Sequence, residues 1–125
     1  MPTATGSTPA NFELTFVQNA DWSGVFSVTD AAGENVDLTD CSVTAYVWAR
    51  PVDTDPDAPT FTYTSDAGYI TIDDTDNEWT WEIAKEDFDS LTTGGIFQVY
   101  LTYSDGSQDR THEGTFALKK HGSLC

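Results

Sequence analysis

Apolar side chains occupy every second position over much of this sequence, and this period of two constrains the fold more than any other feature. In the segment 79–83, which reads WTWEI, Trp79, Trp81 and Ile83 would share one face of a β-strand. An α-helix would instead turn Trp79 and Trp81 to nearly opposite sides. Core packing explains this face better than a sugar-binding platform, because Ile83 continues the aromatic pair. The alternation therefore predicts strands with a buried aromatic face.

The alternating segments and the turn signals between them predict an all-β, antiparallel sandwich. Turns recur about every eight to twelve residues, which is the spacing found in sandwiches and barrels. Aromatic and β-branched residues carry much of the apolar content, which favours strands over helices. The dipeptide Asp105-Gly106 is the strongest hairpin signal in the chain. The expected strands are residues 12–18, 22–30, 42–49, 60–64, 69–73, 79–83, 95–104 and 114–119.

One short segment departs from the strand pattern. In KEDFDSL, residues 85–91, Phe88 and Leu91 stand three apart, as two residues on one face of a helix do. The two glycines that follow are a stop signal. We therefore expect a single helical turn at residues 85–91 that closes one open end of the sandwich.

The 125 residues are expected to form one domain with two short appendages. Residues 1–11, which are rich in Thr, Ala, Gly, Ser and Pro, predict a flexible N-terminal arm. Residues 12–119 carry the strand pattern, and residues 120–125 form a C-terminal tail. The N-terminus lacks the basic and apolar regions of a signal peptide, so we expect synthesis in a cytoplasm.

The chain carries a formal net charge of −16, from 21 acidic against 5 basic residues. This charge opposes binding to nucleic acid and to anionic membrane surfaces, and it suits a basic protein partner. No apolar run reaches the roughly 18 residues that a membrane-spanning helix needs. We therefore expect protein partners, and neither nucleic acid nor a membrane.

No motif in the sequence predicts catalysis or a metal centre. Asp is a turn former, and Asp37 and Asp40 are expected to bond the backbone at the corner before residue 42. The acidic segment 73–82 lacks the glycine of a calcium loop, and a weak cation site there is the alternative. His112 and His121 have no paired cysteines at zinc spacing and are expected on the surface. Because no nucleophile or phosphate-binding motif occurs, we expect no enzyme and no cofactor.

Two cysteines and two tryptophans remain as candidate site residues. The acids beside Cys41 are expected to raise the pKa of its thiol, which disfavours a catalytic role for this residue. Cys125 is a cross-linking thiol toward another chain, a passive thiol or the disulfide partner of Cys41, and the sequence leaves these three open. Trp22 and Trp48 are candidate interface anchors that we expect to be partly exposed.

The order and spacing of several segments resemble a family of phage proteins. The segments are VDLTDCSVTAYVWAR (36–50), GYITI (68–72), IFQVYLTYSDG (96–106) and EGTFALKK (113–120). Over about residues 12–119 the chain is similar to the N-terminal domain of siphophage baseplate upper proteins and to related immunoglobulin-like domains of tailed-phage structural proteins. It departs from their pattern at Cys41, where the family usually carries Gly or a polar residue. It also ends just after the module, where a baseplate upper protein continues.

The resemblance implies an immunoglobulin-like β-sandwich with a structural role and no catalytic residue. We expect a small stand-alone virion protein, assembled in the cytoplasm of the bacterial host and placed at the tail, baseplate or neck, where it can act as a fibre adaptor. Its partners would be other virion proteins, and its copies would form a ring or a symmetric array. The alternatives are a capsid decoration protein of the same fold and a carbohydrate-binding module that uses Trp22 or Trp48.

Overall fold

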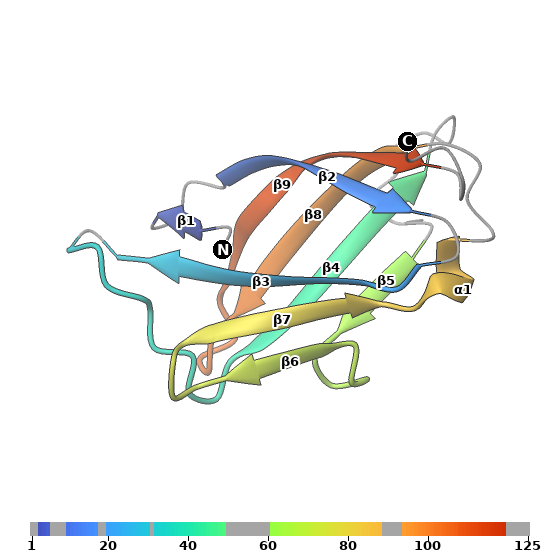
Figure 1. The fold of residues 1–125 in the computed structure, drawn as a ribbon. Coiled ribbons are helices and arrows are strands. Elements are labelled where there is room, and N and C mark those ends of the chain that lie inside the picture. Colours follow the sequence, from blue (N-terminus) through green and yellow to red (C-terminus); the bar gives the residue numbers. More distant parts are fainter. Residues whose placement is uncertain are drawn as a thin grey trace.

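The described part of the chain forms an all-β sandwich of two sheets, as the alternation predicts, together with one short helix. The computed structural model describes residues 3–5, 10–17, 20–30, 32–49, 61–88 and 94–119. Figure 1 shows the two sheets as two layers that face each other. No helix in this part of the chain is long and apolar enough to cross a membrane.

The smaller sheet has the strand order β1-β3-β7-β6, and the larger sheet has the order β2-β9-β8-β4-β5 (Figure 1). The strands of the smaller sheet are β1 (Thr3–Thr5), β3 (Trp22–Thr29), β7 (Glu78–Ile83) and β6 (Ile70–Asp73). Those of the larger sheet are β2 (Ala10–Val17), β9 (Gln108–Lys119), β8 (Gly95–Thr102), β4 (Ser42–Ala49) and β5 (Phe61–Thr64). Each of the eight expected strands thus has its counterpart; the ends agree within about two residues, except that β9 begins at Gln108, well before the expected start at residue 114.

The N-terminal segment supplies two parallel pairs, whereas the other paired strands described are antiparallel. β1 pairs with β3, and β2 pairs with β9 over its whole length. The chain therefore passes from the smaller sheet to the larger one between β1 and β2. Residues 3–5 and 10–11 are strand residues, which differs from the flexible arm expected for residues 1–11. The physical reason is that each sheet offers an edge whose backbone groups can pair with an incoming chain. The tail of residues 120–125 lies outside the described residues.

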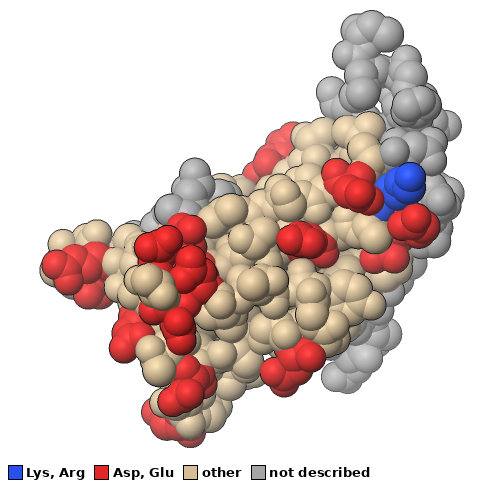
Figure 2. Space-filling view, turned by 60° about the horizontal axis from the view of Figure 1, so that its bottom comes forward, with Lys and Arg blue, Asp and Glu red and all other residues tan. Residues whose placement is uncertain are grey.

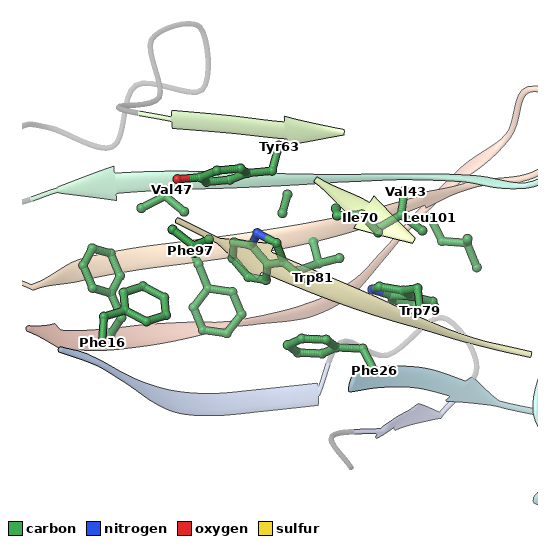
Figure 3. Close-up of a cluster of buried hydrophobic side chains, with 14 of the residues drawn as sticks. Phe16, Phe26, Val43, Val47, Tyr63, Ile70, Trp79, Trp81, Phe97 and Leu101 are labelled. Carbon is green, nitrogen blue, oxygen red and sulfur yellow. The ribbon is translucent and has the colours of Figure 1, made fainter. Parts of the chain in front are cut away.

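The aromatic face predicted for residues 79–83 lies in the core between the sheets, and this prediction is confirmed. Trp79, Trp81 and Ile83 are 1%, 0% and 2% exposed. Figure 3 shows Trp81 within the cluster of buried side chains that both sheets contribute. Its ring centroid lies 5.7 Å from that of Tyr63 and 6.2 Å from that of Phe97, so Trp81 packs one sheet against the other.

The expected helical turn is present as α1 (Lys85–Phe88). Phe88 is buried, and its ring stacks on that of Phe16 with the centroids 5.0 Å apart. The hydroxyl of Tyr63 donates a hydrogen bond of 2.9 Å to Oδ2 of Asp87. These contacts fix α1 against one end of the sandwich, where Figure 1 shows it. Leu91 lies outside the described residues.

The corner between β3 and β4 is built by backbone hydrogen bonds to short side chains. Gly33 has a φ of +82°, which glycine adopts without strain. Oδ1 of Asp37 accepts from the backbone N–H of Thr39 at 3.0 Å and from its hydroxyl at 2.7 Å. These bonds hold the pKa of Asp37 below its ordinary value. Leu38 is buried in the core, so the corner also helps to close the sandwich.

His112 is buried, and its expected surface position is wrong. β9 begins at Gln108, earlier than the alternation predicts, and the phase that buries Phe116 continues backward to His112. His112 pairs with Val99 of β8, and its Nδ1 lies 2.8 Å from Oγ1 of Thr111. The aromatic rings packed on the imidazole are those of Phe12, Phe26 and Trp79.

Candidate functional site

A groove of about 410 Å³, which we call the acidic groove, opens beside the start of β3 and the end of β7. Its volume is in the range of ligand-binding clefts. The two paired strands and the turn between β5 and β6 bring its walls together. The side chains that give it chemical character are Asp21, Trp22, Tyr69 and Glu82.

Trp22 is a half-buried wall of the acidic groove, in agreement with the partial exposure expected for it. Its ring packs on the core through Trp81 and Phe16, with centroids 5.1 Å away in both cases. The absence of a side chain at Gly24 leaves room for the Trp22 ring, because a Cβ on residue 24 would lie only 2.9 Å from Cη2 of Trp22. The ring is therefore held rigidly while part of it remains open to a partner. Its role as an interface anchor stays a prediction.

Tyr69 is the second aromatic residue that lines the acidic groove. It is 47% exposed, and it is the only large hydrophobic side chain classed as exposed in the described part of the chain. Its ring lies edge-on to that of Tyr63, with the centroids 5.4 Å apart. The sequence places Tyr69 out of phase with Ile70, so its outward direction could be predicted. Its high exposure could not, because that depends on the neighbouring strands.

Two carboxylates flank these rings, and no basic side chain lines the groove among the described residues. Oδ1 of Asp21 accepts a 2.8 Å hydrogen bond from the backbone N–H of Lys85, which fixes the carboxylate at the rim. Glu82 is exposed on the outer face of β7. Figure 2 shows acidic side chains spread over one face of the molecule; they are densest toward its left end, whereas the start of β3 and the end of β7 lie toward the right end (Figure 1). The groove therefore combines aromatic rings with negative charge, which is the chemistry that receives a cation.

A second groove, which we call the sheet groove, lies on the outer face of the larger sheet and has a volume of about 240 Å³. Its lining residues are Tyr46, Trp48, Gln98, Tyr100 and Gln108. Trp48 is only 3% exposed, so its expected partial exposure is wrong. The ring of Tyr46 packs beside it on this face, with the centroids 5.9 Å apart.

Cys41 is a half-buried free thiol at the start of β4. Burial is the main cause that raises the pKa of Cys41, and the charges of Asp37 and Asp40 raise it further. The direction agrees with the sequence-based expectation, although burial rather than charge dominates. Sγ lies 3.7 Å from the carbonyl oxygen of Thr39 and 3.8 Å from that of Asp37. Because Cys125 lies outside the described residues, a cross-link involving either thiol stays a prediction.

The acidic turn between β6 and β7 brings three carboxylates together, those of Asp73, Asp76 and Glu78. One oxygen of each lies within 4.8 Å of the others. Oδ1 of Asp73 accepts from the backbone N–H of Thr75 at 2.9 Å and of Asp76 at 3.1 Å. Asp73 thus acts as a turn-forming residue, which is the role that the sequence favours for it.

We expect the chain to lose stability between about pH 10 and pH 12. Burial, followed by the hydrogen bond from its hydroxyl to Asp109, raises the pKa of Tyr103 from 10 to about 12. As the pH rises, Tyr103 loses its proton at a lower pH in the unfolded chain than in the folded protein. Its stabilisation of the fold is therefore complete below pH 10 and disappears as the pH approaches 12. Burial and Asp87 raise the pKa of Tyr63 in the same direction.

Urea unfolding at a series of alkaline pH values would measure this loss. In Tyr103→Phe the free energy of unfolding should fall less steeply with pH, because the side chain cannot ionise. An equal fall in both proteins would contradict the assignment to Tyr103. A titration of tyrosinate absorbance in the native protein provides an independent reading of the raised pKa.

No family model matches this chain in the comparison with known proteins, and no curated protein matches it significantly. The two grooves and the strong negative charge are therefore the observations from which a function can be inferred.

Proposed function

We propose that this chain is an immunoglobulin-like assembly module of a tailed-phage particle, and that it docks through the acidic groove onto a basic surface of a neighbouring virion protein. The observation that carries the docking is the placement of two aromatic rings, Trp22 and Tyr69, beside two rim carboxylates, Asp21 and Glu82. The module is placed at the tail, baseplate or neck, and it acts through protein–protein contacts without catalysis.

The strand order supports the immunoglobulin-like part of this proposal. In immunoglobulin domains strands B, E and D share one sheet, and strands C, F and G share the other. If β3 and β4 correspond to B and C, then β6 to β9 correspond to D, E, F and G, and both sheet orders agree. The phage-like segments 36–50 and 96–106 contain β4 and most of β8, which are neighbours in the larger sheet.

A basic side chain fits the acidic groove better than an apolar one. The face of an aromatic ring is negative and attracts a guanidinium or ammonium group within about 6 Å, most strongly when the ring is that of tryptophan. The planar guanidinium of arginine can stack on the exposed ring of Tyr69 or pair with the carboxylate of Glu82. An apolar anchor would bury the charge of Glu82 without giving it a partner, which costs free energy.

The net charge of −16 also favours a basic partner. Copies of so acidic a chain repel one another, so a ring of copies needs positive charge between or beneath them. Opposite charge also accelerates the encounter of the two partners and discriminates against other acidic proteins. The symmetric arrangement that we propose therefore depends on the basic neighbour as much as on contacts between copies.

Titration of the isotope-labelled protein with a capped tri-arginine peptide, followed by NMR, would test the groove. We expect shifts at the indole N–H of Trp22 and at residues 69 and 82, and weaker binding at higher salt. Glu82→Lys should weaken binding about tenfold, because it replaces attraction with repulsion. Tyr69→Ala should weaken it about fivefold through the lost cation–π contact.

Matched controls separate the groove from the general charge of the protein. Asp74→Lys makes the same change of charge in the exposed turn between β6 and β7 and should reduce peptide affinity about twofold at most. Equal losses in Asp74→Lys and Glu82→Lys would mean that only the net charge binds the peptide. A capped tri-glutamate peptide should give no shifts.

The place of the chain in a virion needs a separate measurement. Quantitative mass spectrometry of purified phage particles that encode this chain should find it at the copy number of a ring, roughly six to a few dozen. Hundreds of copies would favour the capsid decoration protein. Absence from the particles would contradict a structural role, whatever the peptide titration shows.

A further inference from the structure

The sheet groove carries no ionised side chain, although it belongs to a chain with a net charge of −16. It is lined by three aromatic rings and two amides, and it lies on strands β4, β8 and β9. A charged ligand would find no counter-charge among these side chains. The composition of the groove therefore fits a neutral ligand and differs from that of the acidic groove.

The aromatic rings form one connected wall across β4 and β8. The ring of Tyr46 lies 5.9 Å from that of Trp48 and 5.7 Å from that of Tyr100, to which it is edge-on. Tyr46 and Tyr100 are half-buried, so each leaves part of its ring open. Ring faces carry negative charge density, and they attract the slightly positive C–H groups of a flat aliphatic ring.

The amides of the sheet groove are oriented by hydrogen bonds to their neighbours. Oε1 of Gln98 accepts from the hydroxyl of Tyr100 at 2.9 Å, so its NH₂ group keeps two hydrogens for a ligand. Nε2 of Gln108 donates to Oγ1 of Thr102 at 2.9 Å, and its Oε1 remains an acceptor. The groove thus presents a fixed donor and a fixed acceptor beside aromatic faces.

A neighbouring hollow of about 220 Å³ extends this surface toward β2, and the two share Gln98. Its polar side chains include Asn11 and Thr115, which are neutral. Glu113 also lines it, but its Oε1 lies 3.0 Å from Nε of Arg110, so its charge is compensated. The two hollows share Gln98, and their side chains are neutral apart from the paired Glu113, so we call them together the neutral track.

We propose that this track binds a neutral carbohydrate chain. One sugar ring packs its C–H face on Tyr46, while its hydroxyl groups pair with the amides of Gln98 and Gln108. A sugar offers C–H groups on its face and hydroxyl groups at its edge, which matches the separation of rings and amides in the groove. A purely apolar segment of a protein would bury the NH₂ group of Gln98 and Oε1 of Gln108 without giving them hydrogen-bond partners, which disfavours it.

Saturation-transfer NMR with a panel of sugars would test the proposal. The panel contains neutral hexose and N-acetylhexosamine oligosaccharides, together with uronic acid oligosaccharides of matched length. We expect at least one neutral oligosaccharide to bind. Tyr46→Ala should then lower its affinity about tenfold through the lost stacking. Gln108→Ala should lower it about fivefold through the lost hydrogen bond.

Tyr69→Ala removes an aromatic ring from the acidic groove and is the matched control, with an expected change in sugar affinity of less than about twofold. The proposal is overturned if no neutral sugar binds, if only uronic acids bind, or if Tyr69→Ala weakens binding as much as Tyr46→Ala does. Gln108 is exposed, so Gln108→Ala keeps the test decisive even if Tyr46→Ala does not fold. Far-ultraviolet circular dichroism of each variant shows whether its fold is intact.

Discussion

Replacing Trp81 with alanine is expected to lower the free energy of unfolding by about 3–5 kcal/mol. Trp81 is 0% exposed, and its ring contacts residues of both sheets. On its own sheet it packs edge-on against Trp22, and on the larger sheet it packs against Tyr63 and Phe97. Since a domain of this size is stable by roughly 5–15 kcal/mol, the cavity would remove a large part of its stability.

Urea unfolding of Trp81→Ala, Trp81→Phe and Tyr69→Ala would measure this effect. Trp81→Phe keeps a ring between the sheets and removes an indole Nε1 that has no hydrogen-bond partner among the described residues, so its cost should be about 1–2 kcal/mol. Tyr69→Ala removes an exposed ring and should cost less than about 1 kcal/mol. If Trp81→Ala cost no more than Tyr69→Ala, the packing of the two sheets through Trp81 would be wrong.

The effect of Trp81→Ala should also reach the acidic groove. The ring of Trp22 lies 5.1 Å from that of Trp81, which supports it from the core side. Without this support the Trp22 ring gains freedom, and a bound cation must restrict it again at an entropic cost. We therefore attribute the rigidity of the groove to the same residue that joins the sheets.

The strands could be predicted because their burial follows the period of two closely. In β8 buried and half-buried residues alternate from Gly95 to Thr102 without a break. In β4 the alternation of Val43, Ala45 and Val47 on the core side puts Tyr46 and Trp48 on the outer side, where they line the sheet groove. The low exposure of Trp48 could not be predicted, because it depends on which strands lie next to β4.

The errors in the prediction come from register and pairing, which a single sequence does not specify. His112 belongs to the buried phase of β9, whereas its side chain was expected on the surface. A register shift in the pairing of β8 with β9, between Val99 and Tyr100, separates the two halves of that pair, and no residue type marks it. The pairing of β2 with β9 was also missed, because parallel partners lie far apart in sequence and leave no local turn signal.

Replacing Gly114 with alanine is expected to destabilise the protein by about 2–5 kcal/mol. Gly114 pairs with Phe12 in the parallel ladder between β2 and β9. A Cβ at this position would overlap the carbonyl oxygen of Phe12, and a backbone atom cannot move aside as a flexible side chain can. The φ of Gly114 is +153°, a conformation that L side chains rarely adopt.

Gly106→Ala is the matched control for the cost of placing an alanine at a positive φ. Gly106 also has a positive φ, of +89°, but an added Cβ would meet no atom within 4 Å. Its cost should be about 1–2 kcal/mol, so the excess in Gly114→Ala measures the overlap with Phe12. In Gly114→Ala the amides of residues 10–17 should exchange their hydrogens faster than in the unmodified protein. The amides of β4 should remain protected. Equal costs in the two variants would mean that β2 is not held against β9, and its edge would then be free to pair with a neighbouring subunit.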